Sequence, residues 1–435
     1  MKTQETLCIN KNGNLSIGGC DTQDLVKQFG TPLYVMDYAH IKNMANAMVE
    51  AAKLYYPDSL VCYASKALAC LGMYQITASL GLGADVASGG ELFTALQAGT
   101  NPQGIYFHGN NKTVSELTDA LNADIHAVVI DSFDEITRLD ALATQHKKVQ
   151  GVMIRVNPGV EAHTHEYIQT AKVDSKFGLS IQDGSALKAV AKVLEAKNLK
   201  LLGLHCHIGS QIFETEPFEL AVDKMTDFIA VIAKTLNVHI QELNMGGGFG
   251  IRYTEEDKPL EPKAYVQAIA QKLKQAVKEK GLKAPRLILE PGRSIVGEAG
   301  ITLYEIGTIK KIPDVRTYVA VNGGMYDNPR HALYQAKYAA TLALKAAEPK
   351  TEKVTIAGKC CESGDILTKD VSIQKPSVGD ILAVYSTGAY NYSMASNYNR
   401  NLIPPVVLAK EGSAEYLIKP QSYQDLIARD VIIKA

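Results

Sequence analysis

From residue 60 onward, short apolar runs rich in β-branched and aromatic residues alternate with longer segments whose apolar residues recur every three or four positions. The first pattern is typical of buried strands and the second of amphipathic helices. The eight strand-like runs are LVCYA (60–64), ADVA (84–87), IYFH (105–108), VVID (128–131), VMIRV (152–156), LGLHCH (202–207), ELNM (242–245) and LILE (287–290). The helix-like segments between them include GGELFTALQAG, TVSELTDALNA, FDEITRLDALATQH and GSALKAVAKVLEAK. Eight such alternations predict an α/β fold, a (β/α)8 barrel.

An open, doubly wound sheet is the alternative arrangement of alternating strands and helices. Its nucleotide-binding fingerprint, G-x-G-x-x-G after the first strand, is absent, because GGGFG (246–250) follows the seventh run and does not match it. The P-loop pattern G-x-x-x-x-G-K-[ST] does not occur either. We therefore favour the barrel.

After Arg293 the alternation stops and strand-like runs follow one another with turns between them. These runs are ITLYEIGTIKKI (301–312), RTYVAVNGG (316–324), KVTIAGKCCE (353–362), DILAVYSTG (380–388) and PPVVLAKEG (404–412). The opening segment LCINKNGNLSIGG (7–19) is typical of a hairpin that could join them. We expect an N-terminal segment (1–33) joined to the β domain, a barrel (34–298) and a mostly β C-terminal domain (299–435).

Charge and composition indicate a small-molecule partner. The 435 residues carry 45 basic and 46 acidic side chains, a net charge of -1, which provides no field for nucleic acid or an anionic membrane. The chain shows neither the apolar core of a signal peptide nor an apolar stretch approaching the roughly 20 residues of a membrane span, so we expect a cytoplasmic protein. The seven cysteines include no C-x-x-C pair, and we expect most of them to be reduced core residues.

The residues at the ends of the predicted strands are candidates for chemistry, because active sites of such barrels form at the C-terminal ends of the strands. These residues are Lys66, Ser88-Gly89-Gly90, His207, Gly246-Gly247-Gly248 and Glu290-Pro291-Gly292-Arg293. Lys66 stands in an otherwise apolar or weakly polar segment. Its stem could pack while its charge reaches water, as in most lysines. Alternatively, a pocket could hold it as a neutral amine or a Schiff base, since desolvation lowers the pKa of a lysine.

The glycines after the seventh and eighth runs lie where such barrels commonly bind phosphate. Without a Cβ atom, the backbone amides can approach an oxyanion closely. A tight turn would explain one glycine but not three in succession. A lysine facing a phosphate cradle suggests pyridoxal phosphate, whose aldehyde reacts with an amine. Glu290 could then keep the pyridine nitrogen protonated, although a strand-end carboxylate could also simply pair with an arginine.

His205 and His207 lie on one face of the sixth predicted strand, because side chains alternate along a strand. Two histidines in H-x-H, without a third ligand at zinc-like spacing, are a weak metal signal. We favour packed or hydrogen-bonding histidines, with His207 as an aromatic cover on a cofactor ring. HTH (163–165) lies in a long predicted loop and is given no metal role, so no metal is expected.

Together these segments resemble the barrel-type (fold type III) pyridoxal phosphate-dependent decarboxylases, and within that family the diaminopimelate decarboxylases. The matching segments are TPLYVMD, YASKA, DVASGGEL, RVNPGVEAHTHEYIQTAKVDSKFG, HCHIGSQ, NMGGGFG, EPGRSIVG, GGMYDNPRHALY, CCESGD and TGAYNYSMASNYN. They occur in family order nearly from end to end. Jointly they are highly specific, whereas GGGFG alone would indicate little.

The resemblance implies a site for pyridoxal 5'-phosphate. Lys66 would hold the cofactor as a Schiff base, His207 would stack on the pyridine ring, and Glu290 would pair with the ring nitrogen. The other implied contacts are Asp85 near the Schiff base, and Ser210, Gly247, Gly248, Gly292, Arg293 and Tyr390 around the phosphate or the adjoining substrate. The role of Tyr390 rests on the resemblance alone.

The resemblance also implies a substrate site shared between the protomers of a homodimer. Arg293, Arg330 and Tyr334 would hold a substrate carboxylate, since a guanidinium can meet a carboxylate through two hydrogen bonds. Cys361, as a catalytic residue, and Glu362 would enter from the second protomer. For Arg330 and Tyr334 the sequence alone would favour an ordinary surface or core position.

The resemblance predicts conversion of meso-2,6-diaminopimelate to L-lysine and carbon dioxide, the last step of lysine biosynthesis. Racemases of similar fold generally place an arginine against the ring nitrogen, so Glu290 favours decarboxylation. One alternative is a decarboxylase of lysine, ornithine, arginine or carboxynorspermidine, whose substrates give Arg293 and Arg330 less to bind. Another is a non-catalytic cofactor-binding regulator, which would be expected to lose Lys66 or Glu362.

Two positions depart from the family pattern. Asn322 stands where the family often has aspartate, and Leu68 stands where a polar residue is frequent. We expect local changes in hydrogen bonding at these positions and unchanged chemistry.

Overall fold

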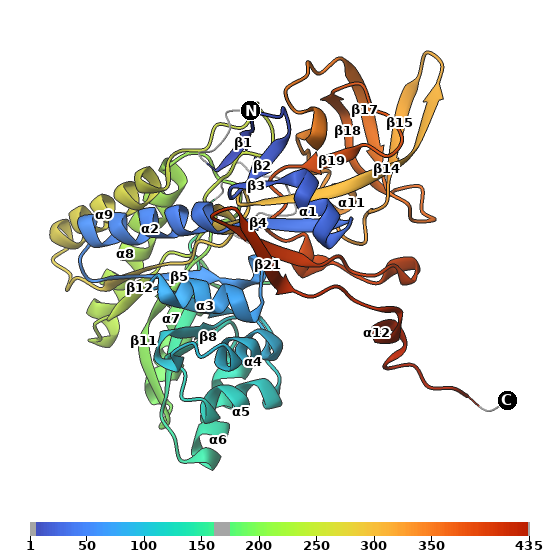
Figure 1. The fold of residues 1–435 in the computed structure, drawn as a ribbon. Coiled ribbons are helices and arrows are strands. Elements are labelled where there is room, and N and C mark those ends of the chain that lie inside the picture. Colours follow the sequence, from blue (N-terminus) through green and yellow to red (C-terminus); the bar gives the residue numbers. More distant parts are fainter. Residues whose placement is uncertain (1–5, 161–174, 434–435) are drawn as a thin grey trace. The chain divides into compact units, whose positions relative to one another are not determined.

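The structure is a computed structural model that describes residues 6–160 and 175–433 (Figure 1). Contacts between residues divide the chain into two compact units. The barrel unit comprises Met44–Gly250 and Pro259–Ser294, and the β unit comprises Met1–Asn43, Ile251–Lys258 and Ile295–Ala435. The domain limits expected from the sequence stay a prediction.

The barrel unit contains eight parallel strands that close into a ring. They are β5 (Ser59–Ala64), β6 (Gly83–Val86), β7 (Ile105–Phe107), β8 (Ala127–Ile130), β9 (Gln150–Asn157), β11 (Leu199–His205), β12 (Glu242–Asn244) and β13 (Arg286–Leu289). Each strand pairs with the next, and β13 pairs with β5 to close the ring. The short β10 (Leu179–Ser180) adds to the end of β9. Each of the eight strand-like runs is thus a barrel strand, and the predicted fold class is confirmed.

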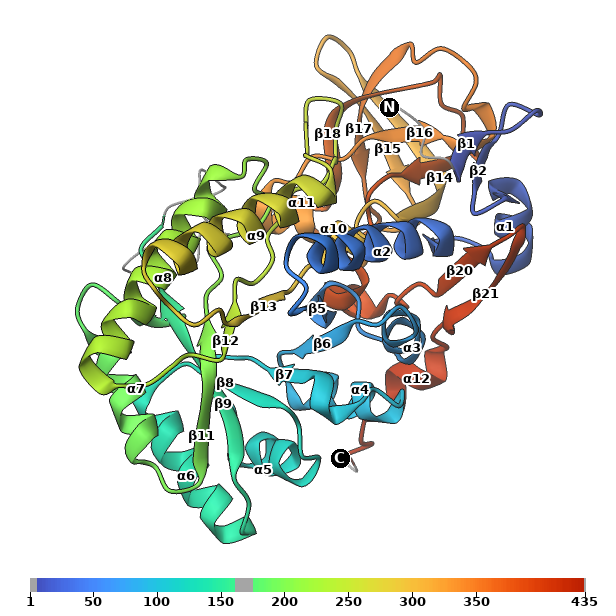
Figure 2. The ribbon, with the colours of Figure 1, turned by 90° about the vertical axis from the view of Figure 1, so that its left-hand side faces the viewer.

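Helices lie outside this ring, between successive strands (Figure 2). They are α3 (Leu71–Ser79), α4 (Gly89–Gln97), α5 (Val114–Asn122), α6 (Phe133–His146), α7 (Ser185–Glu195), α8 (Glu216–Leu236) and α9 (Pro262–Glu279), with α2 (Tyr38–Tyr55) before β5. Their starts follow from side-chain caps. In α5, Thr113 accepts a hydrogen bond from the backbone N–H of Glu116, and the Glu116 carboxylate accepts one from the N–H of Thr113. This capping box satisfies two N–H groups that have no partner within the helix.

The interior of the ring is filled by side chains. Buried residues from the strands form one cluster: Cys62, Tyr106, Ala127, Val129, Met153, Leu202 and Ile288. A barrel filled in this way is a packed core rather than a channel. Sites for ligands must therefore lie at the ends of its strands.

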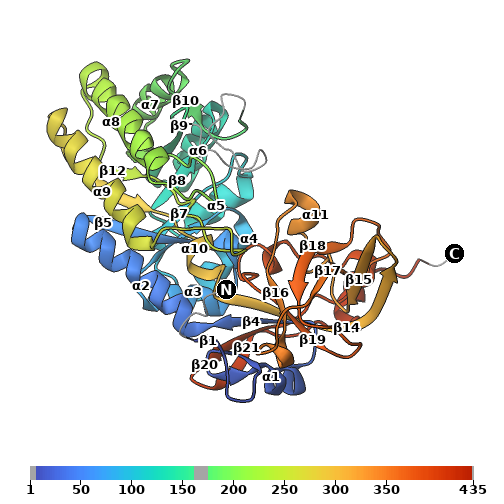
Figure 3. The same cartoon turned by 90° about the horizontal axis from the view of Figure 1, so that it is seen from above.

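The β unit is built around one large sheet with the strand order β18-β17-β15-β14-β4-β20-β21. Its strands are β4 (Leu33–Asp37), β14 (Gly300–Ile312), β15 (Arg316–Val321), β16 (Ala340–Leu342), β17 (Glu352–Ala357), β18 (Ile366–Ile373), β19 (Ile381–Val384), β20 (Val406–Lys410) and β21 (Ser413–Ile418). The strand β14 pairs with β4 and β19 along its first half and with β15 along its second half (Figure 3). The strand β4, which lies almost wholly beyond the expected N-terminal segment (1–33), pairs with β14 and β20 and so belongs to this sheet.

The N-terminal hairpin is also present, as β1 (Leu7–Ile9) and β2 (Leu15–Ile17), followed by β3 (Cys20–Asp21) and α1 (Thr22–Phe29). Three short helices complete the list: α10 (Arg293–Val296), α11 (Arg330–Tyr334) and α12 (Tyr423–Ile427). The strands β16, β18 and β21 were not expected from the sequence. Polar residues interrupt β18 and β21, so neither segment forms an apolar run. In the described part of the chain, no helix is both long and apolar enough to cross a membrane.

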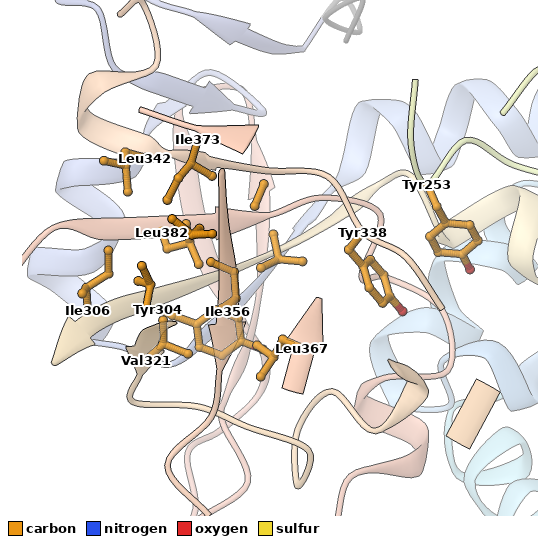
Figure 4. Packing of buried hydrophobic residues seen from close by; sticks show 14 of the residues in the cluster. Tyr253, Tyr304, Ile306, Val321, Tyr338, Leu342, Ile356, Leu367, Ile373 and Leu382 are labelled. Carbon is orange, nitrogen blue, oxygen red and sulfur yellow. The ribbon is translucent and has the colours of Figure 1, made fainter. Parts of the chain in front are cut away.

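Buried side chains between the strands of the β unit form a core cluster (Figure 4). Tyr304, Ile306 and Val321 belong to this cluster. Tyr253 and Tyr338 lie at one end of it, and each carries a hydroxyl group. Burying an aliphatic or aromatic side chain of this size contributes about 1.5–3 kcal/mol. The core therefore fixes Tyr253 and Tyr338 as rigid supports for polar neighbours.

Candidate active site

Lys66 lies on a short 3-10 turn (Ser65–Ala67) directly after β5. It is the only exposed residue in the segment 61–68, whose other side chains are buried. The neighbouring Ser65 is fully buried, and its hydroxyl lies 2.7 Å from the carbonyl oxygen of Asp85 and 3.1 Å from the carboxylate of Glu91. These contacts hold the turn against β6 and α4. Lys66 is therefore an exposed amine on a well-anchored turn at the C-terminal end of a strand.

Glu290 follows β13 directly and is buried. Its Oε1 accepts a hydrogen bond from Nδ2 of Asn244 at 2.5 Å and lies 2.8 Å from Nε2 of His108. Its Oε2 lies 3.1 Å from Nε2 of His205. His108 follows β7, while His205 and Asn244 end β11 and β12. Side chains at the ends of three other strands are thus directed at the one carboxylate that follows β13.

The charges in this network follow from burial and from pairing. Burial alone would raise the pKa of Glu290, but His108 and His205 hold it well below its usual value, so the carboxylate is ionised. Burial lowers the pKa of His205 to about 3, so its ring is neutral and Nε2–H donates to Glu290. Burial also acts to lower the pKa of His108, but the carboxylates of Asp85 and Glu290 outweigh it and raise the pKa above its ordinary value.

Asp85, on β6, lies on the other side of His108, with 3.7 Å between its Oδ1 and Nε2 of the histidine. Burial raises the pKa of Asp85 to about 6, against the opposing effects of His108 and Lys66. His207 follows β11, and burial, together with the charge of Lys66, lowers its pKa well below the ordinary value. Lys66, Asp85, His207 and Glu290 are therefore close enough to influence one another electrostatically.

Glycines allow the backbone to pack closely at the ends of β12 and β13. A Cβ atom on Gly247 would lie 2.2 Å from the carbonyl oxygen of Glu290, and one on Gly248 would lie 2.3 Å from that of Gly209. A Cβ on Gly292 would lie 2.8 Å from a carbonyl oxygen of β5. Backbone, rather than flexible side chains, stands in the way, so no larger residue fits. Gly248 also requires a φ of +107°, which L-residues rarely adopt.

The loops after β11, β12 and β13 are tied to one another. The backbone N–H of Ile212 donates to the carbonyl of Gly248 at 3.0 Å. Nε and Nη2 of the buried Arg293 lie 3.2 and 3.0 Å from the hydroxyl oxygen of Ser210. A guanidinium, a hydroxyl and glycine backbone therefore surround one end of the ring of strands, the chemistry that binds a phosphate.

These residues fit a pyridoxal phosphate. An ionised carboxylate carries about four acceptor positions, and three donors already use those of Glu290, which leaves one position on Oε2 for a protonated ring nitrogen. The glycine loops, with the hydroxyl of Ser210 and the guanidinium of Arg293 beside them, offer the donors that suit the phosphate. Lys66 is the exposed amine at the same end of the strands.

A metal ion is the other ligand that this cluster could hold. His108, His205 and Glu290 each offer one ligand atom, and these atoms lie within 4.8 Å of one another. Both histidines already direct Nε2 at the carboxylate at hydrogen-bonding distance, so hydrogen bonds account for the cluster without an ion. The expectation of no metal stays a prediction, and HTH (163–165) lies outside the described residues.

The predicted substrate residues of the β unit are described within that unit. Arg330 begins α11 and is buried, and its Nη1 donates to the hydroxyls of Tyr253 at 2.7 Å and Tyr338 at 3.1 Å. Its guanidinium also lies over the Tyr253 ring, 4.9 Å from the ring centre, and 6.0 Å from that of Tyr334. The aromatic support of Tyr253 and Tyr338 leaves the remaining N–H groups of Arg330 to bind an anion.

Cys361 and Glu362 are both exposed, on the loop between β17 and β18. The backbone N–H of Cys361 donates to Oδ1 of Asn399 at 2.8 Å. Tyr390 is half-buried and adopts a φ of +66°, which is uncommon for a non-glycine residue. Such an outlier persists only where the surroundings enforce it. These positions agree with functional roles but do not test them.

Sequence reasoning missed His108 and Asn244. Both lie at strand ends, in IYFH and ELNM, where the rule used for Lys66 and Glu290 would have listed them. A single histidine or asparagine has many structural uses, so the residue type alone does not indicate a function. The signal was their position, since the C-terminal ends of parallel strands converge.

The comparisons with known proteins agree with this site. The family model described as "Pyridoxal-dependent decarboxylase, pyridoxal binding domain" matches residues 40–297. The chain is 46% identical over 425 residues to the diaminopimelate decarboxylase of Bacillus subtilis, covering 98% of this chain and 97% of that one. It is 47% identical to that of Staphylococcus aureus, covering 98% and 99% of the two chains.

A solved structure extends the likeness to the whole fold. The crystal structure of diaminopimelate decarboxylase from M. jannaschii in complex with L-lysine has a TM-score of 0.92 and 37% sequence identity, and the match covers 99% of this chain and 98% of that one. The family match spans more than half of the chain, and the relatives match nearly all of it. The chain therefore belongs to the pyridoxal-dependent decarboxylases, in the group of the diaminopimelate decarboxylases.

Proposed function

We propose that this chain converts meso-2,6-diaminopimelate to L-lysine and carbon dioxide, the last step of lysine biosynthesis, with pyridoxal 5'-phosphate as cofactor. The observation that carries the proposal is Glu290, a buried carboxylate held ionised at the strand ends with one acceptor position left. Bound pyridoxal phosphate supplies a protonated ring that takes up the electron pair left at Cα when carbon dioxide departs. A carboxylate beside the ring nitrogen keeps that ring protonated, which favours decarboxylation over racemisation.

Residues of the barrel unit would hold the cofactor. Lys66 provides the amine that bonds to its aldehyde carbon, and His207 covers its ring. Asp85 stabilises the positive charge next to Lys66, because the two groups already influence each other electrostatically. The phosphate binds to the residues that surround the glycine loops: Ser210, Gly247, Gly248, Gly292 and Arg293, with Tyr390 from the β unit.

The substrate's distal carbon carries both a carboxylate and an ammonium, and separate groups would bind them. Arg330, with Arg293 and Tyr334, binds the carboxylate, and the buried position of Arg330 makes this contact strong. Glu362 accepts from the ammonium, and Cys361 returns a proton to Cα after carbon dioxide has left. Both come from the second protomer of a homodimer, since the exposed loop that carries them can reach another chain.

The test is carbon dioxide release from meso-diaminopimelate, its LL isomer, lysine, ornithine and arginine. We expect turnover of the meso isomer at least tenfold above the others. Preferred turnover of lysine, ornithine or arginine would show instead a related decarboxylase, and no turnover of any substrate by protein that binds pyridoxal phosphate would support a regulator. The cytoplasmic location expected from the sequence stays a prediction.

A further inference from the structure

Two loops of the β unit carry most of the proposed substrate residues. The arginine loop (residues 322–329) leads from β15 into Arg330, and the cysteine loop (residues 358–365) joins β17 to β18 and carries Cys361 and Glu362. The two loops are separated by about 30 residues of sequence. Their relative position must be fixed if one substrate end is to meet both.

One buried carboxylate joins the two loops. Oδ1 of Asp365 accepts a hydrogen bond from the backbone N–H of Met325 at 2.6 Å, and its Oδ2 accepts one from the N–H of Cys360, also at 2.6 Å. Met325 belongs to the arginine loop and Cys360 to the cysteine loop. A backbone bond from Lys359 N–H to the Gly323 carbonyl, at 2.9 Å, runs beside them. Each carboxylate oxygen of Asp365 thus accepts a hydrogen bond from a different loop.

The loops are shaped around this carboxylate. A Cβ on Gly324 would lie 2.7 Å from Oδ2 of Asp365, and one on Gly358 would lie 2.3 Å from both oxygens. Neither glycine has a positive φ, so space for the carboxylate, rather than backbone conformation, requires them. Asp365 is only 3% exposed, and no cation pairs with it among the described residues. Burial raises the pKa of Asp365, and two charge-assisted bonds to backbone N–H groups oppose this effect.

Each loop is also attached to other parts of the β unit. Asp327 fixes the arginine loop from within, because its Oδ1 accepts from the Tyr304 hydroxyl at 2.5 Å and its Oδ2 from the Gly324 N–H at 3.0 Å. Asn399 fixes the cysteine loop at the N–H of Cys361. Neither attachment connects the two loops to each other. The carboxylate of Asp365 makes this connection with both of its oxygens, beside the backbone bond from Lys359 to Gly323 and a contact of the Cys360 thiol with the backbone of Tyr326.

We infer that Asp365 is a positioning residue of the substrate site: its carboxylate holds the cysteine loop against the arginine loop, so that Cys361 and Glu362 act from a fixed place relative to Arg330. The consequence for catalysis rests on the proposed function, whereas the connection between the loops does not. Asp365 itself touches no reacting atom in this scheme.

The first test is hydrogen exchange on the holoenzyme of the variant Asp365→Asn. The amide keeps the volume of the side chain but turns an NH2 group toward one of the two donors, so one loop loses its bond. We expect exchange at least about tenfold faster in both 323–328 and 358–364. The matched control is Asp380→Asn, because Asp380 also accepts from a backbone N–H, that of Ser377 at 2.8 Å, in a different turn of the same unit. Faster exchange in one loop alone would overturn the connection.

The second test is a double-mutant cycle with Glu362→Gln. We expect Asp365→Asn to lower kcat/KM for meso-diaminopimelate at least tenfold while the absorbance spectrum of the bound cofactor stays unchanged. In the Glu362→Gln background, Asp365→Asn should lower kcat/KM less than about threefold. The contact of Glu362 with the substrate, which Asp365 would position, is already lost in that background. Fully additive losses would overturn the positioning role and leave Asp365 as a stability residue.

A third variant tests the same connection without depending on the folding of Asp365→Asn. If Asp365→Asn does not fold, Gly324→Ala, whose methyl group would press on the carboxylate, should give the same exchange and kinetic pattern. An inactive wild-type enzyme would contradict the proposed function alone, since the exchange experiment still measures the connection of the loops.

Discussion

The two ends of the barrel each bury a glutamate beside histidine, yet the two sites differ in what they can do. At the C-terminal end, Glu290 is surrounded by residues that follow or end three other strands, and an acceptor position remains on its carboxylate among the described residues. At the N-terminal end, Glu242 begins β12, and its oxygens lie 2.9 Å from Nε2 of His126 and 3.2 Å from the hydroxyl of Tyr106.

The difference lies in the surroundings rather than in the buried carboxylate. Glycine loops and an exposed amine accompany Glu290, whereas Glu242 meets a tyrosine whose ring belongs to the packed interior. This contrast supports the proposed role of Glu290 in the chemistry, and it indicates that Glu242 stabilises the barrel. The experiments below test this division, beginning with the largest expected effect.

Lys66→Ala should abolish activity. No other described lysine is exposed directly after a barrel strand at the C-terminal end of the barrel. In the wild-type enzyme, borohydride reduction followed by peptide mass spectrometry should place a pyridoxyl group on Lys66. A group on any other lysine would contradict the assignment of the chemical end of the barrel.

Mixing two inactive variants tests whether a second chain completes this end. Lys66→Ala and Glu362→Ala homodimers should each be nearly inactive. After subunit exchange, each heterodimer contains one site with both defects and one with neither, so about a quarter of wild-type activity should return in an equal mixture. Exchange demonstrated by mass spectrometry without recovered activity would show that Glu362 serves its own chain.

Glu290→Gln and Glu242→Gln form a matched pair. The first removes the negative charge next to the proposed ring nitrogen and should lower kcat by roughly 10²–10³-fold. The second should leave kcat within about threefold and lower the melting temperature, because it disturbs the bonds to His126 and Tyr106. Steady-state kinetics and calorimetry of both variants distinguish the roles, and equal kinetic losses would erase the distinction between the two ends.

Arg330→Ala should act on specificity. Loss of a charge-assisted contact costs on the order of 2 kcal/mol, or about 30-fold in kcat/KM for meso-diaminopimelate. Turnover of lysine, which lacks the distal carboxylate, should change much less. Arg330→Lys, which keeps the charge but not the planar fork, serves as the control. Similar losses on both substrates would make Arg330 structural.

In the cofactor-free protein, Asp85→Asn should change the melting temperature by a few degrees, in a way that depends on pH. The pKa of Asp85 is raised to about 6 in the fold, so its protonated form stabilises the protein fully below pH 4, and this stability is lost as the pH rises through 6. The variant cannot deprotonate, so its melting temperature relative to wild type should rise between pH 4 and 7. Glu290→Gln should show the opposite trend, because the pKa of Glu290 is lowered.

Much of this fold could be predicted from the sequence because the barrel strands are continuous apolar runs with clear helices between them. Buried parallel strands have no polar face, so their runs are easy to locate. The strands β18 and β21 were not predicted because exposed polar residues interrupt them; in β18 these are Lys369 and Asp370.

The site could be predicted in part for a related reason. Lys66 and Glu290 stand out as charges at the ends of apolar runs, whereas His108 and Asn244 become meaningful only when the ring closes and brings their strands beside β13. Arg330 and Asp365 depend on contacts between distant loops, which no local pattern encodes. At Asn322, where aspartate is frequent in the family, Nδ2 donates to the Thr31 hydroxyl and Oδ1 accepts from the Glu305 N–H. An aspartate could only accept at both places.

The pairing of β4 with β20 has a consequence for synthesis of the chain. β4 ends at Asp37, but its parallel partner begins at Val406, so this strand must wait for nearly the whole chain to be translated. The barrel strands, by contrast, are all complete once Leu289 has emerged. On a ribosome the barrel unit can therefore close first, while β4 stays exposed as an unpaired apolar edge that invites aggregation until β14 and then β20 arrive.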